Sequence, residues 1–225
     1  MMNVVELTDY TTEPIGTGHG LYDVSFILSK GDVCSIQTDS QDDAHNFLRA
    51  LATLTPPVSG SYAFKGDKLD FSDYRNLLCY KKQIGYVGPD SALLSNRTIR
   101  ENLLFMRYHF ENSLSIDLDD NTAHLFRLFE IENELDMRPA AMNPLDVKLA
   151  ITIRELAKSP EVLLLFRPED FVGQTKFDLL MDILKKLVAS ETPVVFLSYE
   201  NGFLETLSSR KIVIADGRLK TVGSQ

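Results

Sequence analysis

The sequence has no tryptophan, only two cysteines among 225 residues, and no long hydrophobic run. Its longest uninterrupted apolar segment runs from Val162 to Phe166, far short of the ~18 residues with which a helix crosses a bilayer. Cys34 and Cys79 stand in apolar sequence contexts, so we expect no disulfide framework. The N-terminal residues lack a basic segment followed by a long apolar stretch, so we also expect no signal peptide. These absences favour a chain that works in a reducing cytosol.

Positive charge is also scarce. The 23 Lys and Arg residues face 32 Asp and Glu residues, which gives a formal net charge of −9. Because no basic stripe is available to neutralise phosphates, a nucleic-acid partner is not expected. The four histidines are scattered along the chain, so we expect no metal site. A hydrophobic content of 44% is nevertheless that of a globular chain with a real core.

What the sequence does contain is an ordered succession of strand and helix patterns. Strands are expected within the first 35 residues, at 62–67 and at 84–87, with a loop at 37–41 before a helix whose apolar positions end at Leu54. Helices are expected at 99–108, 122–129, 145–157 and 177–188, and a terminal hairpin at 211–219. The continuous apolar runs at 162–166 and 194–197 are typical of buried parallel strands.

This order predicts an α/β fold with a parallel core sheet, an antiparallel N-terminal β subdomain and a helical insert. We expect a single domain over residues 1–225, with the helical subdomain at approximately 95–157. No internal repeat or low-complexity segment interrupts it.

Several short phrases stand along this order, each weak by itself. They are Asp-Val-Ser-Phe at 23–26, Phe-Leu-Arg-Ala-Leu-Ala at 47–52, Ile-Gly-Tyr-Val at 84–87, Ala-Leu-Leu-Ser-Asn at 92–96, Thr-Ile-Arg-Glu-Asn at 98–102, Glu-Leu-Ala-Lys-Ser-Pro-Glu-Val-Leu-Leu-Leu at 155–165 and Asp-Gly-Arg at 216–218. In this order and at these separations, they make the chain resemble the nucleotide-binding subunit of ABC transporters over its whole length. The resemblance implies the P-loop NTPase-like fold of ABC ATPases. An unrelated α/β domain is the alternative.

The phosphate-binding loop of that family, Gly-x-x-Gly-x-Gly-Lys-Ser/Thr, has lost its functional residues here. It falls on Thr38, Asp39, Ser40, Gln41, Asp42, Asp43, Ala44 and His45. No glycine remains, Ala44 stands where the lysine would be, and His45 replaces the hydroxyl that holds Mg²⁺. Asp42 and Asp43 would face a polyanion, so we expect no ordinary Mg-ATP binding. A simpler interpretation is that the two acids stabilise the first turn of a helix.

The other family motifs are replaced in parallel. Pro89 stands at the Gln-loop position, Phe166 and Arg167 at the metal-binding Asp and catalytic Glu, and Tyr199 at the switch His. The signature segment falls on Met142, Asn143, Pro144, Leu145 and Asp146. A register shift of one or two residues would bring Glu169 or Asp170 near the site, and Glu169 is then the alternative general base. At the adenine-stacking position no aromatic can be placed, and Tyr10 is better explained by core packing.

The intact scaffold with replaced motifs predicts a catalytically degenerate, non-hydrolysing structural or regulatory subunit that needs no cofactor. The alternatives are an atypical but active ABC ATPase that binds ATP and Mg²⁺, and a soluble interaction scaffold without a transporter. Phe-Val-Gly-Gln at 171–174 is similar to the ATPase subunits of bacterial MCE-linked phospholipid transporters, which suggests a lipid-transport branch.

The resemblance also implies partners and a location. We expect a homo- or heterodimer with a second ATPase-type subunit, docked on a permease at the cytoplasmic side of the inner membrane. The residues expected to dock the permease are Ala92, Leu93, Leu94, Arg97, Arg100 and Leu103. A core helix with a solvated face would explain this segment equally well.

Overall fold

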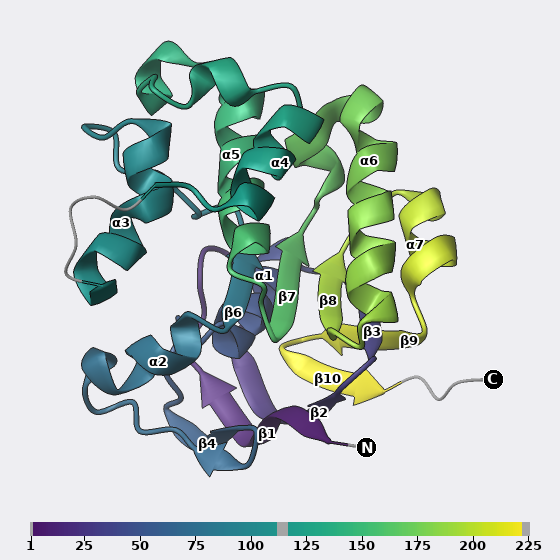
Figure 1. The fold of residues 1–225 in the computed structure, drawn as a ribbon. Helices are drawn as coiled ribbons and strands as arrows, with labels where there is room; N and C mark the ends of the chain where they lie inside the picture. Colours follow the sequence, from purple (N-terminus) through teal and green to yellow (C-terminus); the bar gives the residue numbers. More distant parts are fainter. Residues whose placement is uncertain (1, 112–116, 222–225) are drawn as a thin grey trace.

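The computed structural model describes residues 2–111 and 117–221, which form two sheets and the helices around them (Figure 1). The antiparallel sheet has the order β2-β1-β4-β5, and the core sheet the order β10-β9-β3-β8-β7-β6. The antiparallel strands are β1 (Asn3–Thr12), β2 (Leu21–Ser29), β4 (Ser59–Phe64) and β5 (Asp67–Lys68). The core strands are β3 (Val33–Thr38), β6 (Ile84–Val87), β7 (Val162–Phe166), β8 (Val194–Leu197), β9 (Arg210–Ala215) and β10 (Arg218–Thr221).

Within the core sheet the strands β9, β3, β8, β7 and β6 are parallel, and β10 pairs antiparallel with β9. The helices are α1 (Gln41–Leu51), α2 (Leu78–Lys81), α3 (Ile99–Glu111), α4 (Asp120–Leu128), α5 (Pro144–Ala157), α6 (Glu169–Ala189) and α7 (Asn201–Leu207), with 3-10 turns η1 (Tyr74–Leu77), η2 (Glu132–Glu134) and η3 (Pro139–Ala141). Figure 1 places the antiparallel strands β1, β2 and β4 at the lower end of the molecule and α4, α5 and α6 above them. The predicted α/β architecture is therefore confirmed.

Strand β7 shows how the core sheet is covered on both faces. Its residues Val162, Leu164 and Phe166 belong to one buried cluster, whereas Leu163 and Leu165 belong to the other. The first cluster holds α1, which contacts β2 of the antiparallel sheet as well as β3, β7 and β8. The second cluster holds α5 and α6. A strand covered on both faces needs apolar side chains at every position, which is the continuous run that the sequence displays.

Several element boundaries differ from the sequence predictions. Strand β3 continues through Thr38 and α1 begins at Gln41, so the expected loop at 37–41 shrinks to Asp39 and Ser40. Helix α1 ends at Leu51, before Leu54, because Thr53 adopts a left-handed φ of 59°. The short helices α2 and α7 were not predicted. Helix α6 begins at Glu169, earlier than expected, and is interrupted at Gly173, whose φ is 64°.

In the described part of the chain, no helix has the length and apolar character needed to span a membrane.

Candidate functional site

The parallel strands bring most of the predicted site residues to one edge of the core sheet. Ligands of open α/β sheets bind beyond the carboxyl ends of the strands. Here the segments that leave β3, β6, β7 and β8 at this edge carry residues 39–45, Pro89, Arg167 and Tyr199, and Phe166 ends β7 itself. Two ring contacts join neighbouring segments: His45 to Phe166 and Arg167 to Tyr199. The carboxyl edge of the core sheet is therefore the candidate functional site.

The turn into α1 satisfies its own backbone groups. Ser40 is the N-cap, and its hydroxyl accepts a hydrogen bond from the Asp43 N–H at 3.3 Å. The Ser40 N–H donates to the Thr38 hydroxyl at 3.0 Å, and that hydroxyl donates back to the Ser40 carbonyl at 2.8 Å. A phosphate cradle instead presents its N–H groups outward to the anion. The N–H groups of Ser40 and Asp43, by contrast, already donate hydrogen bonds within the chain.

The carboxylates of Asp42 and Asp43 hold a loop from the antiparallel subdomain. Asp42 accepts hydrogen bonds from the Thr17 N–H at 2.7 Å and the Thr17 hydroxyl at 2.9 Å. Asp43, whose side chain is buried, accepts from the N–H groups of His19 at 2.7 Å and Gly20 at 3.2 Å. Its second oxygen lies 2.9 Å from His19 Nδ1. We call residues 16–20 the 16–20 loop. It lies directly against the N-terminus of α1.

Glycine is required where the 16–20 loop approaches these acids. A Cβ on Gly18 would stand 2.5 Å from Asp43 Oδ1, and a Cβ on Gly16 would collide with Asp42 Oδ2. Gly16 also has a left-handed φ of 54°. Sequence reasoning missed this arrangement. The available signal was the spacing of three glycines at 16, 18 and 20, together with the adjacent acids at 42 and 43.

These contacts change the titration of two groups. The hydrogen bonds from Thr17, backbone first, hold the pKa of Asp42 below its ordinary value. The hydrogen bond to Asp43, and then the charge of that carboxylate, raise the pKa of His19. Both shifts favour the charged forms, a carboxylate and an imidazolium. The N-terminus of α1 therefore carries negative charge that this chain already compensates.

His45, which the sequence resemblance aligns with the magnesium-binding hydroxyl, belongs to a polar cluster. Its Nε2 lies 3.0 Å from the Tyr86 hydroxyl and 3.1 Å from Asp90 Oδ1. Tyr86 donates to Asp90 at 2.7 Å, and Arg49 forms an ion pair with the same carboxylate. The imidazole edge packs on Phe166, with ring centroids 5.5 Å apart. Magnesium prefers an octahedron of oxygen ligands, so this imidazole and phenyl pair does not fit it.

The segments after β7 and β8 are tied to each other. Glu169 accepts hydrogen bonds from the Ser198 hydroxyl at 2.9 Å and the Tyr199 N–H at 3.0 Å, one on each carboxylate oxygen. Arg167 has a left-handed φ of 51°, pairs with Asp170 at 3.0 Å and stacks 5.4 Å from the Tyr199 ring. Glu169, the alternative general base, thus holds the backbone that follows β8.

The signature-like segment lies at the start of α5, where Asn143 caps the helix by accepting a bond from the Leu145 N–H at 3.0 Å. Pro144 at the first turn has no N–H to offer a ligand, and Asp146 lies 3.5 Å from Lys176. Tyr10 is fully buried and donates to the Thr55 carbonyl at 2.7 Å, which agrees with the core-packing interpretation.

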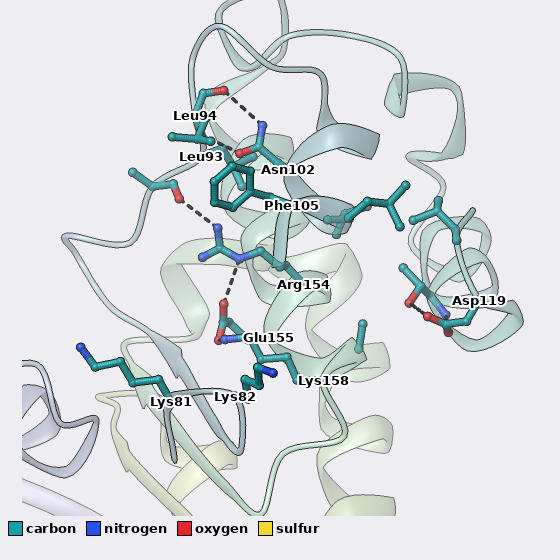
Figure 2. A pocket seen from close by; sticks show the side chains of 16 residues that line it. Lys81, Lys82, Leu93, Leu94, Asn102, Phe105, Asp119, Arg154, Glu155 and Lys158 are labelled. Atoms are coloured by element: carbon teal, nitrogen blue, oxygen red, sulfur yellow. Dashed lines mark hydrogen bonds and ion pairs between the residues drawn. The ribbon is translucent and has the colours of Figure 1, made fainter. Parts of the chain in front are cut away.

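A groove of about 640 Å³ opens between the 92–94 segment, α2, α3 and α5 (Figure 2). Of the expected docking residues, Ala92, Leu93, Leu94 and Leu103 line it. Arg97 and Arg100 do not line it. Arg97 pairs with Glu101 at 3.3 Å, and Arg100 with Asp136 at 2.9 Å and Asp117 at 3.3 Å.

Asn102 fixes the shape of this groove. Its amide accepts from the Leu94 N–H at 2.7 Å and donates to the carbonyls of Leu94 at 3.1 Å and Thr98 at 2.9 Å. Sequence reasoning missed the cationic part of the lining because it comes from α2, α5 and their flanks, far from the 92–103 segment. These residues are Lys81, Lys82, Arg154 and Lys158.

Comparison with known proteins gives related sequences at low identity. No protein-family model matches the chain. The chain is 24% identical to the methionine import ATP-binding protein MetN of Lactobacillus johnsonii, a match that covers 96% of this chain and 63% of MetN. It is 22% identical to the arginine transport ATP-binding protein ArtM of Bacillus subtilis, over 95% of this chain and 88% of ArtM. The chain thus spans about three fifths of the length of the MetN relatives.

Solved structures with a fold similar to that of this chain are also ATP-binding cassettes. The dimeric ATP-binding cassette MJ0796, in a post-hydrolysis state bound to ADP and Pi, matches with a TM-score of 0.80 and 20% identity, over 98% of this chain and 100% of that one. An ATP-binding subunit of an ABC transporter matches with a TM-score of 0.81 and 16% identity, over 98% and 90% of the two chains. The chain therefore has the fold of an ABC ATPase cassette and is similar in sequence to the ATP-binding subunits of ABC transporters.

Proposed function

We propose that this chain is a catalytically degenerate relative of ABC transporter ATP-binding subunits, serving a bacterial transporter as a non-hydrolysing structural or regulatory subunit. The observation that carries the proposal is the bonding of Asp42 and Asp43 to the 16–20 loop at the N-terminus of α1. The relatives carry names of ATP-binding proteins, so the proposal is that this chain has kept their fold and lost their chemistry.

Electrostatics argue against phosphate at this helix N-terminus. At ~4 Å and an effective dielectric of ~20, one like-charge contact costs roughly 4 kcal/mol. The dipole at a helix N-terminus stabilises a nearby anion by only ~0.3–1 kcal/mol. Moving Asp43 aside would also leave the N–H groups of His19 and Gly20 without their acceptor. Mg-ATP therefore does not fit the residues present, and we assign this chain no hydrolytic step.

The proposal has consequences for a dimer. In ABC ATPase dimers each site joins the phosphate loop of one subunit to the signature of the other. Beside a competent ATPase, this chain would remove one site through its α1 N-terminus and place the 142–146 segment at the other. At most one site could then turn over, and a homodimer would be inactive. A permease would dock at the groove lined by Leu93, Leu94 and Leu103, at the cytoplasmic side of the inner membrane.

A nucleotide titration tests the non-hydrolysing role. Purified chain titrated calorimetrically with ATP and Mg²⁺ should give no saturable heat, and its Tm should not rise with nucleotide. A Mg²⁺-dependent Kd in the micromolar range would overturn the proposal and favour the atypical ATPase. In that case Glu169→Gln, which keeps the hydrogen bonds to Ser198 and Tyr199 in reach, should abolish any hydrolysis while the affinity remains.

Co-expression with a permease separates the transporter subunit from a soluble scaffold. The wild-type chain should co-purify with the permease in detergent, and Leu94→Asp in the groove should lose it. The matched control is Val58→Asp, because Val58 is also an exposed apolar residue but lies outside the groove. Equal recovery of both variants would contradict docking at the groove.

The phospholipid branch is the more specific part of the proposal. It rests on the similarity of Phe171-Val172-Gly173-Gln174 to MCE-linked transporter ATPases. Phe171 and Val172 belong to α6 and are buried in the cluster that also holds α5, so packing alone accounts for half of that phrase. The relatives reported above are named for methionine import and arginine transport. Transport assays with phospholipid and with amino acids would distinguish the two substrate classes.

A further inference from the structure

A second cavity, of about 360 Å³, adjoins the groove between the C-terminal end of α1, strand β6 and the C-terminal end of α5. Its volume is that of a pocket for a small molecule. None of residues 38–45 lines it, so the cavity is separate from the N-terminus of α1. Part of its wall is apolar and comes from Ala52, Leu54 and Ile84. Most of the remaining wall is charged.

The charged part of this lining has an excess of positive charge. Its cations are Arg49, Lys81, Arg154 and Lys158, and its acids are Asp90 and Glu155. The lining therefore carries two more positive than negative charges, in a chain whose formal net charge is −9. The partial charge of about −0.5 at the C-terminus of a helix such as α5 does not cancel this excess. The ligand that balances the lining is a small dianion.

One buried acid holds two of the cations in place. Glu155, whose side chain is only 3% exposed, pairs with Arg154 at 2.9 Å and with Lys158 (Figure 2). It also accepts a hydrogen bond from the Tyr86 N–H at 3.2 Å, which fixes it to strand β6. Guanidinium and ammonium groups have more N–H donors than one carboxylate contact uses, so both cations keep donors for a ligand. Because their positions are already fixed, an anion that binds them orders little else.

Lys81 reaches the cavity from α2 and differs from these two cations. Among the described residues it has no ion-pair or hydrogen-bond partner, although it is half-buried. Burial lowers the pKa of its ammonium group. An anion that approaches a partly desolvated cation stabilises the charged form. Lys81 therefore gains more from an anionic ligand than a cation that is already paired.

We propose that this cavity binds a phosphate dianion, as free phosphate or as the phosphoryl group of a small phosphomonoester, between Lys81 on one side and Arg154 and Lys158 on the other. A phosphoryl group places about two negative charges and several acceptor oxygens on one centre. It can therefore balance the excess charge and accept hydrogen bonds from both sides. A monocarboxylate would leave one positive charge unbalanced. The apolar part of the wall would take the organic part of a phosphomonoester.

Isothermal titration calorimetry of the full chain, at about pH 8 and without Mg²⁺, tests this site with inorganic phosphate and with glycerol 3-phosphate. Wild type should bind at least one of these probes saturably, at one site per chain. Lys81→Met removes the charge and keeps a long side chain, so it should weaken binding about 10-fold or more. Lys81→Arg keeps the charge and should bind more tightly than Lys81→Met. The matched control is Lys185→Met, which should bind as wild type, since Lys185 lies on α6 outside the cavity and pairs with Asp182 at 3.7 Å.

The two probes distinguish the sources of the phosphate. Tighter binding of glycerol 3-phosphate would support a phosphomonoester, and tighter binding of inorganic phosphate would support the free ion. No saturable heat with either probe, or equal affinities of wild type and Lys81→Met, would overturn the proposal. Tighter binding of succinate than of both probes would overturn it in favour of a dicarboxylate. Thermal unfolding of each variant shows whether it is folded.

This site goes beyond the proposed transporter role, and its failure is distinguishable from the failure of that role. Neither probe is a nucleotide, and the titration contains no Mg²⁺ and no permease. A Mg-ATP affinity that survives in Lys81→Met, while phosphate binding is lost, would defeat the non-hydrolysing role alone.

Discussion

Two regions of this molecule differ in how fully their polar groups are paired within the chain. At the N-terminus of α1, Asp42 and Asp43 bond to the 16–20 loop, so the charges are satisfied within the chain. At the groove, large apolar side chains are exposed and Lys81 has no partner among the described residues. A site whose polar groups are paired internally has little left to offer a ligand, whereas an incompletely satisfied surface gains from one. This difference is why we propose a docking role for the groove and no nucleotide-binding role for the N-terminus of α1.

The largest effect is expected from Asp43→Ala. It removes the acceptor of the His19 and Gly20 N–H groups in a fully buried position. We expect the free energy of unfolding to fall by roughly 2–5 kcal/mol in urea denaturation. Asp42→Ala is the control, because its partner Thr17 is exposed and water can replace the carboxylate. Its loss should be about 1 kcal/mol or less. Equal losses would show that burial of Asp43 does not matter.

Gly18→Ala should weaken the contact between the 16–20 loop and Asp43. Its Cβ would stand 2.5 Å from Asp43 Oδ1, so the 16–20 loop must move away from α1. We expect a loss of about 1–3 kcal/mol in the free energy of unfolding. Gly202→Ala, in α7 where a Cβ meets nothing closer than 3.9 Å, should instead be neutral or stabilise by up to ~1 kcal/mol. Similar destabilisation in both variants would contradict a specific close approach.

Substitutions in the groove should impair binding and leave the free energy of unfolding almost unchanged. Leu94→Ser replaces an apolar side chain that is 44% exposed, so unfolding free energy should change by no more than ~0.5 kcal/mol. Recovery of the permease in the co-purification assay should nevertheless fall at least 10-fold. If stability fell and permease recovery did not, Leu94 would be a structural residue and not part of a docking surface.

The smallest effect is a pH dependence at His19. Asp43 raises the pKa of His19 in the folded chain, first by its hydrogen bond and then by its charge, and Asp216 and Asp39 act in the same direction. The stabilisation is therefore complete below the unfolded pKa of about 6.5 and is lost as the pH rises through the higher folded pKa. His19→Gln should lower Tm at pH 6 and match wild type at pH 9. A constant difference at both pH values would exclude the charge as its origin.

The sequence was most informative where structure depends on local pattern. The buried strands β7 and β8 were predicted because coverage on both faces demands continuous apolar runs. The start of α1 lies at Gln41, inside the loop that was expected at 37–41. Ser40 capping Asp43 three residues later is the local signal that places it correctly. The four-residue α2 and seven-residue α7 are too short to show a clear periodicity.

The contacts that matter most for function are non-local. Thr17 and Asp42 are 25 residues apart, and His19 and Asp43 are 24 apart, so no window of about 11–18 residues contains both partners. Similarly, Lys81 reaches the groove from α2, whereas Leu94 comes from the segment before α3. Sequence reasoning could predict the replaced motifs one by one, but it could not pair the acids with the loop that compensates them.

Amide hydrogen exchange at the 16–20 loop tests the central claim most directly. If Asp42 and Asp43 occupy the place of phosphate, the backbone N–H groups of His19 and Gly20 should exchange slowly in the chain alone. Millimolar Mg-ATP should leave their NMR exchange rates unchanged. Fast exchange that becomes slow when nucleotide is added would contradict the account, because the loop would then be ordered by ATP and not by the two acids.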